Sequence, residues 1–252
     1  MRFTKRLRFA SVVKNASILC VISMLLFAGV LVAKEFWETK PFDQWTQKEC
    51  QKLLSDSPWV KELNLTGQVT GGGGGASSLD SRAPFVKYNI QMRSAAPLRQ
   101  AMVRQGQINR KYDSLSDDEK RAFDRSMESF LIGPPPEFVV FHITFETNNL
   151  DYIRDLNRHW ETQNNDMLKN SVFLSAGKGE KVPVAQFIPG TSASQEFQFF
   201  FPREVNGREI IGERDKTLNL EFAYPVVGRI GDGRGFIEFR TDKMKVNNEV
   251  IY

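Results

Sequence analysis

An uncharged, strongly apolar run near the start of the chain constrains its fold more than any other feature. Residues 16–33 are 18 positions without a single Asp, Glu, Lys or Arg. This length lies at the lower edge of what a helix needs to cross a bilayer, and it exceeds the apolar region of most export signals. Such a segment is expected to lie in lipid or to be removed, with a plain buried helix as the alternative, so the globular fold is expected in the residues that follow.

The residues around this run set its expected orientation. Because basic flanks stay on the cytoplasmic side, the body of the chain is expected on the other side of a membrane. A retained single-pass anchor and a cleaved signal peptide both stay open, since Ala33 suits a cleavage site but Leu31 is a poor residue two positions earlier. Five basic residues and no acidic one precede the run: Arg2, Lys5, Arg6, Arg8 and Lys14.

The distribution of charge argues against nucleic acid as a partner. The chain has 34 Lys and Arg against 30 Asp and Glu, a formal net charge of +4. Removing the five basic residues of segment 1–33 leaves 29 basic against 30 acidic residues in the body. A phosphate-binding groove needs a basic excess on the folded body, and this body carries none.

Composition divides the chain into four expected parts. Residues 1–33 are the signal peptide or membrane anchor, and residues 34–66 form a Trp-rich helical module. Residues 67–80 are a Gly- and Ser-rich linker, which lacks the Lys-Ser or Lys-Thr of a phosphate-binding loop. Residues 81–252 are expected to form an α+β globular domain.

The Trp-rich module contains a helix with a defined start. Thr46 and Glu49 have the spacing of a capping box, which predicts a helix over residues 47–55. Cys50 is expected to be a small buried side chain on this helix. Three of the four tryptophans lie in the module and are expected either to pack it onto the body or a membrane interface, or to form an aromatic binding surface: Trp37, Trp45 and Trp59.

Three further helices are predicted in the first half of the globular domain. Ser94 is expected to cap the first, with Leu98 and Ala101 among the residues of its buried stripe. Ser116 and Glu119 form a second capping box, and Asn148-Asn149 begins the third helix. The glycine and three prolines of residues 133–136 end the second of these helices.

From residue 171 onward the pattern predicts strands. Residues 172–174 and 182–187 are expected to pair as a hairpin, and Asn206-Gly207 is a strong turn signal. The predicted fold class is therefore α+β: after the N-terminal signal or anchor helix, helices pack on a C-terminal, mostly antiparallel β sandwich or curved sheet. The clearest alternation of apolar and polar residues falls in 86–92, 139–145, 197–201, 218–224 and 237–239.

Two residues on one predicted strand are candidates for a polar site. His142 and Glu146 share one face of the strand and could present two metal ligands. No third ligand is evident, so no metal is predicted, and a solvated polar face is the simpler interpretation. Neither a Gly-x-Ser-x-Gly elbow nor a His-Glu-x-x-His zinc helix occurs, so the catalytic residues are unknown. A triad assembled from distant loops stays open.

A glycine-rich loop at residues 228–235 is the second candidate. Arg229, Asp232 and Arg234 lie in it, and its backbone amides and guanidinium groups could bind an anion. A strand rather than a helix is predicted to follow, so the loop does not match a dinucleotide site, and no cofactor is predicted. A long hairpin connection is the structural alternative.

Several short motifs resemble those of a family of uncharacterised exported bacterial proteins. Directly after the export segment comes a Phe-Trp…Trp…Ser-Pro-Trp pattern, at Phe36-Trp37, Trp45 and residues 57–59. An Ala-x-Pro-Leu-Arg-x-Ala motif follows at residues 95–101, and a Phe-Phe-Pro-Arg segment at residues 200–203. The resemblance spans most of residues 34–252. It implies a bacterial envelope location and transfers no activity and no functional residue.

These observations leave three hypotheses for function. The first is a non-enzymatic envelope protein, periplasmic and anchored in the inner membrane or secreted, whose β-rich body binds a protein partner or a polymer. The second is an extracytoplasmic hydrolase, which requires a pocket with His142 or His159 beside a carboxylate. The third is an anion or small-ligand carrier. The sequence makes an enzyme the less favoured choice.

Overall fold

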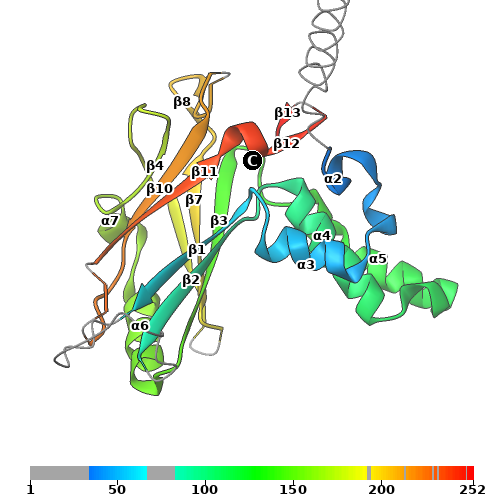
Figure 1. The fold of residues 1–252 in the computed structure, drawn as a ribbon, viewed down its shortest axis with the longest axis horizontal. Helices are drawn as coiled ribbons and strands as arrows, with labels where there is room; N and C mark the ends of the chain where they lie inside the picture. Colours follow the sequence, from blue (N-terminus) through cyan, green and yellow to red (C-terminus); the bar gives the residue numbers. More distant parts are fainter. Residues whose placement is uncertain are drawn as a thin grey trace, which may run out of the picture. The chain divides into compact units, whose positions relative to one another are not determined.

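The computed structural model of the chain describes residues 34–66, 83–191, 194–212, 214–228, 230–231, 233–247 and 249–252. The apolar run 16–33 and the linker 67–80 lie outside these residues. Within the described part, no helix has the length and apolar character that a membrane crossing requires. Residues 36–252 group as one compact unit, whose elements are labelled in Figure 1.

The Trp-rich segment contributes both helices and a strand to this unit. It contains α2 (Phe36–Thr39), η1 (Phe42–Gln44), α3 (Gln47–Ser55) and β1 (Val60–Thr66). The predicted helix is confirmed, and both arms of its capping box are present, with the Glu49 amide donating to Thr46 Oγ1. The strand β1 was not predicted, because Lys61, Glu62 and Asn64 break up its apolar pattern.

Buried indoles join this segment to the C-terminal part of the unit. Trp37, Trp45 and Trp59 are all buried, and Trp37 meets Trp59 edge to face. The Trp59 indole N–H donates to the carbonyl oxygen of Ile251 over 2.6 Å. Cys50 is fully buried, as expected. The tryptophans therefore serve as packing residues.

The three predicted helices are present, and only the N-cap of the first differs from the prediction. They are α4 (Ala96–Asn109), α5 (Asp117–Ile132), after η2 (Tyr112–Ser114), and α6 (Leu150–Thr162), which is followed by α7 (Asn165–Leu168). The capping box of α5 and the Asn149 cap of α6 are confirmed. Ser94 does not cap α4, because Ala95 occupies the N-cap and the Ser94 hydroxyl instead accepts from the Val140 amide.

Two antiparallel sheets form the rest of the unit. A five-stranded sheet has the order β1-β2-β3-β7-β6, and a four-stranded sheet has the order β11-β10-β4-β5. Two short hairpins pair β8 with β9 and β12 with β13, and the first of them turns at the predicted Asn206-Gly207. The bounds of the strands are β2 Phe85–Met92, β3 Phe138–Thr147, β4 Val172–Ala176, β5 Val182–Pro183, β6 Gln186–Pro189, β7 Glu196–Pro202, β8 Glu204–Val205, β9 Arg208–Glu209, β10 Thr217–Ala223, β11 Arg234–Arg240, β12 Lys245–Val246 and β13 Glu249–Val250; η3 (Thr241–Lys243) follows β11.

The hairpin predicted from residues 172–174 and 182–187 is only half right. Residues 182–183 pair with β4 as expected. The chain then leaves this sheet, and residues 186–189 pair with β7 in the other one. A single extended segment thus serves both sheets, which alternation along the chain does not reveal.

Aromatic side chains connect the inner faces of the two sheets. Tyr88 of β2 meets Phe222 of β10 at a ring-centroid distance of 5.8 Å, and Phe141 of β3 meets Phe239 of β11 at 5.4 Å. On α6, Trp160 stacks on Phe197 at 3.9 Å. The predicted α+β class is confirmed, with the antiparallel strands concentrated in the C-terminal half.

The outer face of the five-stranded sheet is covered at one end only. There the segment that enters α4 packs on β3, and Val140 is buried. Along the same face of β3, His142 and Thr144 are partly exposed and Glu146 is exposed. The α3–α5 helices lie beside the sheets in Figure 1, and the rising exposure along β3 shows that this face passes from a covered end to an open end.

Candidate functional site: the arginine pocket

A cavity opens where the covered end of the outer face meets the loop after α5. Its volume is about 310 Å³. We call it the arginine pocket and define it by the side chains that matter for its chemistry. They are Arg93, Arg99, Phe130, Val140, His142 and Gln198.

Arg99 is a buried structural member of this pocket. Its guanidinium donates to the carbonyl oxygens of Leu131 and Ile132, at the end of α5, over 3.4 and 3.5 Å. It also donates to the carbonyl oxygens of Arg93 and Ser94. Four acceptors therefore hold the group, and it caps the carbonyl end of α5. Burial, followed by the charge of Arg203, lowers the pKa of Arg99.

Arg93 differs because one of its buried donors is not matched. One guanidinium nitrogen contacts Met102 Sδ, whereas the fully buried Nε has no hydrogen-bond partner in the described part of the chain. No described carboxylate forms an ion pair with Arg93 or Arg99. Burial lowers the pKa of Arg93 to about 10, opposed by the charge of Glu196, so the group stays charged at neutral pH.

His142 lies next to these arginines in a row that crosses the sheet. Strand pairing places it between Gln91 of β2 and Gln198 of β7. Its Nε2 lies 3.2 Å from a carboxylate oxygen of Glu196. Burial, followed by the charge of Arg93, lowers the pKa of His142 to about 4, so the imidazole is neutral at pH 7.

Gln91 contributes a second unmatched polar atom to this face. Its amide nitrogen donates to the Leu54 carbonyl oxygen over 2.9 Å. Its Oε1 atom is buried and accepts no hydrogen bond from the described residues. An orphaned acceptor at Gln91 and an orphaned donor at Arg93 thus lie two positions apart in the chain, on the same side of the sheet.

The open end of the face continues the site as a polar strip. We give this name to Lys87, Asn89, Thr144 and Glu146, which line a shallower cavity of about 540 Å³ together with Gln91. Glu146 is not brought to His142, because its carboxylate pairs with Lys87 at 2.5 Å. The two predicted residues share a strand face, as expected, but each has a different partner. No group of three metal-ligating side chains occurs among the described residues.

The glycine-rich loop is described only in part. Arg229 and Asp232 lie outside the described residues. Arg234 pairs with Glu221, a buried carboxylate on β10 that Lys181 also contacts. Although burial opposes it, hydrogen bonds from Lys181 and Arg234 keep the pKa of Glu221 below its usual value. The charge of Arg234 is therefore used within the four-stranded sheet.

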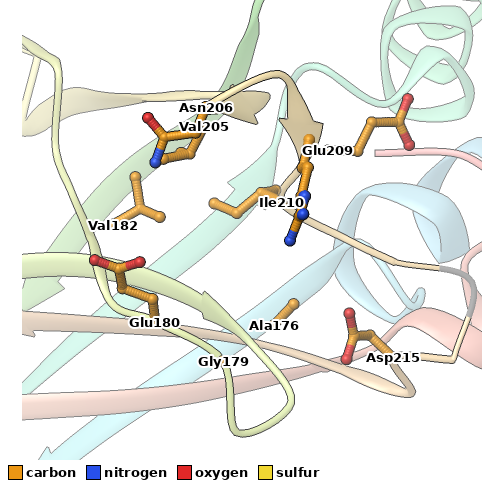
Figure 2. A pocket seen from close by; sticks show the side chains of 10 residues that line it. Ala176, Gly179, Glu180, Val182, Val205, Asn206, Glu209, Ile210 and Asp215 are labelled. Atoms are coloured by element: carbon orange, nitrogen blue, oxygen red, sulfur yellow. The ribbon is translucent and has the colours of Figure 1, made fainter.

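A further cavity lies beside the β8–β9 hairpin, as Figure 2 shows. Its volume is about 430 Å³, and Val205 and Asn206 face Glu180 and Val182 across it. Asp215 at its edge accepts a hydrogen bond from the Gly212 amide over 2.8 Å. Strands β4, β5, β8 and β9 contribute to its lining, and none of its buried polar atoms is unmatched among the described residues, so we consider the arginine pocket the stronger candidate.

Sequence analysis did not identify the arginine pocket. Gln91 lies within the predicted strand at residues 86–92, Arg93 follows it directly, and the motif at residues 95–101 contains Arg99. The missing information was the path of residues 129–134, which close the cavity over β3. His159 lies elsewhere, on α6, with its ring edge-on to Trp160.

The arrangement is suited to holding an anion. It offers one guanidinium with an unmatched donor, a second positive charge fixed beside it and a neutral imidazole. A proton acceptor for catalysis should have a pKa near the working pH, and His142 does not. No described hydroxyl or thiol forms a hydrogen bond with His142. Comparison with known proteins finds no matching family model, no similar curated protein and no similar solved structure.

Proposed function

We propose that this chain is an exported, non-enzymatic binding protein of the bacterial envelope, whose body holds an anionic group in the arginine pocket. The observation that carries the binding role is the Arg93 guanidinium, which is charged, buried at Nε and without a carboxylate partner among the described residues. Leaving such a buried donor without an acceptor costs about 1–3 kcal/mol. A bound anion would supply the missing partner.

The proposed location rests on the sequence. The apolar run 16–33 and the basic residues before it support transfer of the body across a membrane. The short motifs shared with exported bacterial proteins support the envelope. The body would face the periplasm, attached to the inner membrane if the apolar run is retained and free or secreted if it is cleaved.

Cell fractionation tests the location. A strain that expresses the chain with a C-terminal tag is separated into cytoplasm, periplasm and membranes. The tag is expected in the membrane or periplasmic fraction and accessible to protease in spheroplasts. A full-length product in the cytoplasm would contradict the proposal. A pull-down from these membranes in mild detergent would identify a protein partner.

A titration tests the binding role. Thermal unfolding of the full-length chain is followed in mild detergent while acetate or phosphate replaces chloride at constant ionic strength. A ligand that binds only the folded state raises the unfolding temperature. The rise is expected in the native chain and in Arg121→Gln, which removes an exposed arginine of α5, but not in Arg93→Met. The absence of a shift with either anion would count against the role.

A hydrolase is the second candidate, and one observation favours it. His142 lies in a cavity with the Glu196 carboxylate 3.2 Å away, as that hypothesis required. Its low pKa makes it a weak base at neutral pH. Turnover of ester or amide substrates that His142→Gln abolishes would replace the binding proposal with this one.

A further inference from the structure

We infer that the anionic group bound in the arginine pocket is the C-terminal carboxylate of a peptide, an inference that rests on the proposed binding function. Its basis is the pair of orphaned atoms on one face. Arg93 Nε is a donor without an acceptor, and Gln91 Oε1 is an acceptor without a donor. Arg93 lines the arginine pocket and Gln91 lines the cavity of the polar strip, so a ligand that satisfies both must present an anionic acceptor at its end and an N–H or O–H donor farther along.

The terminus of a peptide presents this combination. Its carboxylate can accept two hydrogen bonds from a guanidinium, and its backbone N–H groups can donate to an amide oxygen. Acetate presents acceptors only, so it would satisfy Arg93 and leave Gln91 Oε1 unmatched. Capture of a terminal carboxylate by oriented donors is a known mode of peptide recognition.

The walls of the pocket suit one terminal residue. Phe130, Pro134 and Val140 provide apolar surface beside the two arginines. A volume of about 310 Å³ is at the small end for ligand pockets, which favours a single residue over a large ligand. We expect the last side chain of the peptide to be apolar and to contact these three residues.

The polar strip suits the residues before the terminus. It begins beside Gln91 and runs to Glu146, and its cavity has a volume of about 540 Å³. Asn89 and Thr144, which strand pairing places opposite each other, offer side-chain donors and acceptors to a peptide backbone. The Lys87–Glu146 pair stands at the far end. An extended peptide would therefore run along the outer face, with its carboxylate at the covered end.

Three probes separate this inference from simple anion binding. They are N-acetyl-Ala-Leu, the same dipeptide with a C-terminal amide, and sodium acetate, each titrated against the full-length chain in mild detergent at pH 7.5 and constant ionic strength. A charge-assisted hydrogen bond predicts that the dipeptide acid binds about 10- to 100-fold more tightly than its amide. The acid is also expected to bind more tightly than acetate.

Two pocket variants and one control assign the contacts. Arg93→Met should abolish binding of the dipeptide acid, and Arg121→Gln should leave it unchanged. Gln91→Met should weaken the dipeptide acid several-fold and leave acetate unaffected. Arg93→Lys keeps the charge without the planar fork, so it tests the carboxylate contact if Arg93→Met does not fold. It should bind the acid more weakly than the native chain does.

The outcomes distinguish binding of any anion from recognition of a peptide C-terminus. If acetate, phosphate and the dipeptide acid bind equally well and Gln91→Met changes none of them, the peptide inference is overturned while anion binding stands. If the amide binds as well as the acid, the carboxylate is not the recognised group, and the peptide inference is again overturned. If no probe binds, both the inference and the proposed binding role fail.

Discussion

The two faces of the five-stranded sheet are built from alternate residues of the same strands, yet the inner face is packed with aromatic rings and the outer face carries polar side chains. On the inner face, the rings of Tyr88, Phe141 and Phe199 contact rings of the opposite sheet. Tyr88 also has an unpartnered hydroxyl, but it is neutral, and burial raises its pKa further. On the outer face, the unmatched atoms belong to Gln91 and to the charged Arg93. Packing of the core explains the residues of the inner face, but it does not explain the unmatched polar atoms of the outer face.

The largest effect is expected from truncation on the inner face. Phe222 is fully buried and contacts the rings of Tyr88, Trp160 and Phe199. Phe222→Ala should lower the free energy of unfolding by about 3–5 kcal/mol in urea denaturation. Phe236→Ala, at a position that is 67 % exposed, should change it by no more than about 0.5 kcal/mol. Similar losses for the two variants would mean that the inner face is not the core.

The second-largest effect is a loss of stability at acidic pH, and it tests whether His142 on the outer face is buried. The unfolded imidazole of His142 titrates near pH 6.5, whereas burial and Arg93 lower the pKa of the folded group to about 4. Between these values only the unfolded state takes up the proton, so stability falls as the pH is lowered. The loss due to His142 should be about 3 kcal/mol, complete near pH 4.

Urea unfolding of the native chain and of His142→Gln at several pH values measures the contribution of His142 to this loss of stability. The difference between the two is needed because carboxylates also titrate in this range; hydrogen bonds from Lys40 and Thr46, for example, lower the pKa of Glu49 to about 2. The variant should lose less stability than the native chain between pH 6.5 and 4. Parallel profiles would show that the imidazole is solvated and that the outer face is not closed there.

A third effect should come from the loop that closes the arginine pocket. Gly133 has φ +88°, and a Cβ atom there would lie 2.5 Å from the Arg99 guanidinium carbon. Gly133→Ala should therefore lower stability by about 2 kcal/mol and weaken binding of the dipeptide acid. Gly207→Ala, with φ +72° and open space around it, should lower stability by about 1 kcal/mol and leave binding unchanged. If the two variants lost equal stability and bound the dipeptide acid equally well, the close approach of Gly133 to Arg99 would not matter for the pocket.

The contrast between the faces also explains how far sequence analysis could go. Alternation and capping are local, so β3, β7, α3 and α5 were predicted with nearly their observed bounds. The strand β1 and the crossing of residues 182–189 between the sheets depend on distant pairing and were not. The arginine pocket likewise needs Arg93, His142 and Phe130 to converge from separate elements, which spacing along the chain does not encode.

The smallest stability effect is expected at Arg93. If the outer face holds Arg93 for a ligand, the fold gains no stability from this side chain. The measurement is urea unfolding of the native chain and of Arg93→Met, in a buffer without organic anions or phosphate, followed by the fluorescence of the buried tryptophans. We predict that the variant is as stable as the native chain or more stable by up to about 1 kcal/mol, because methionine removes the unmatched buried Nε donor of a partly buried guanidinium. A loss of about 2 kcal/mol or more would identify Arg93 as a structural residue and contradict the account.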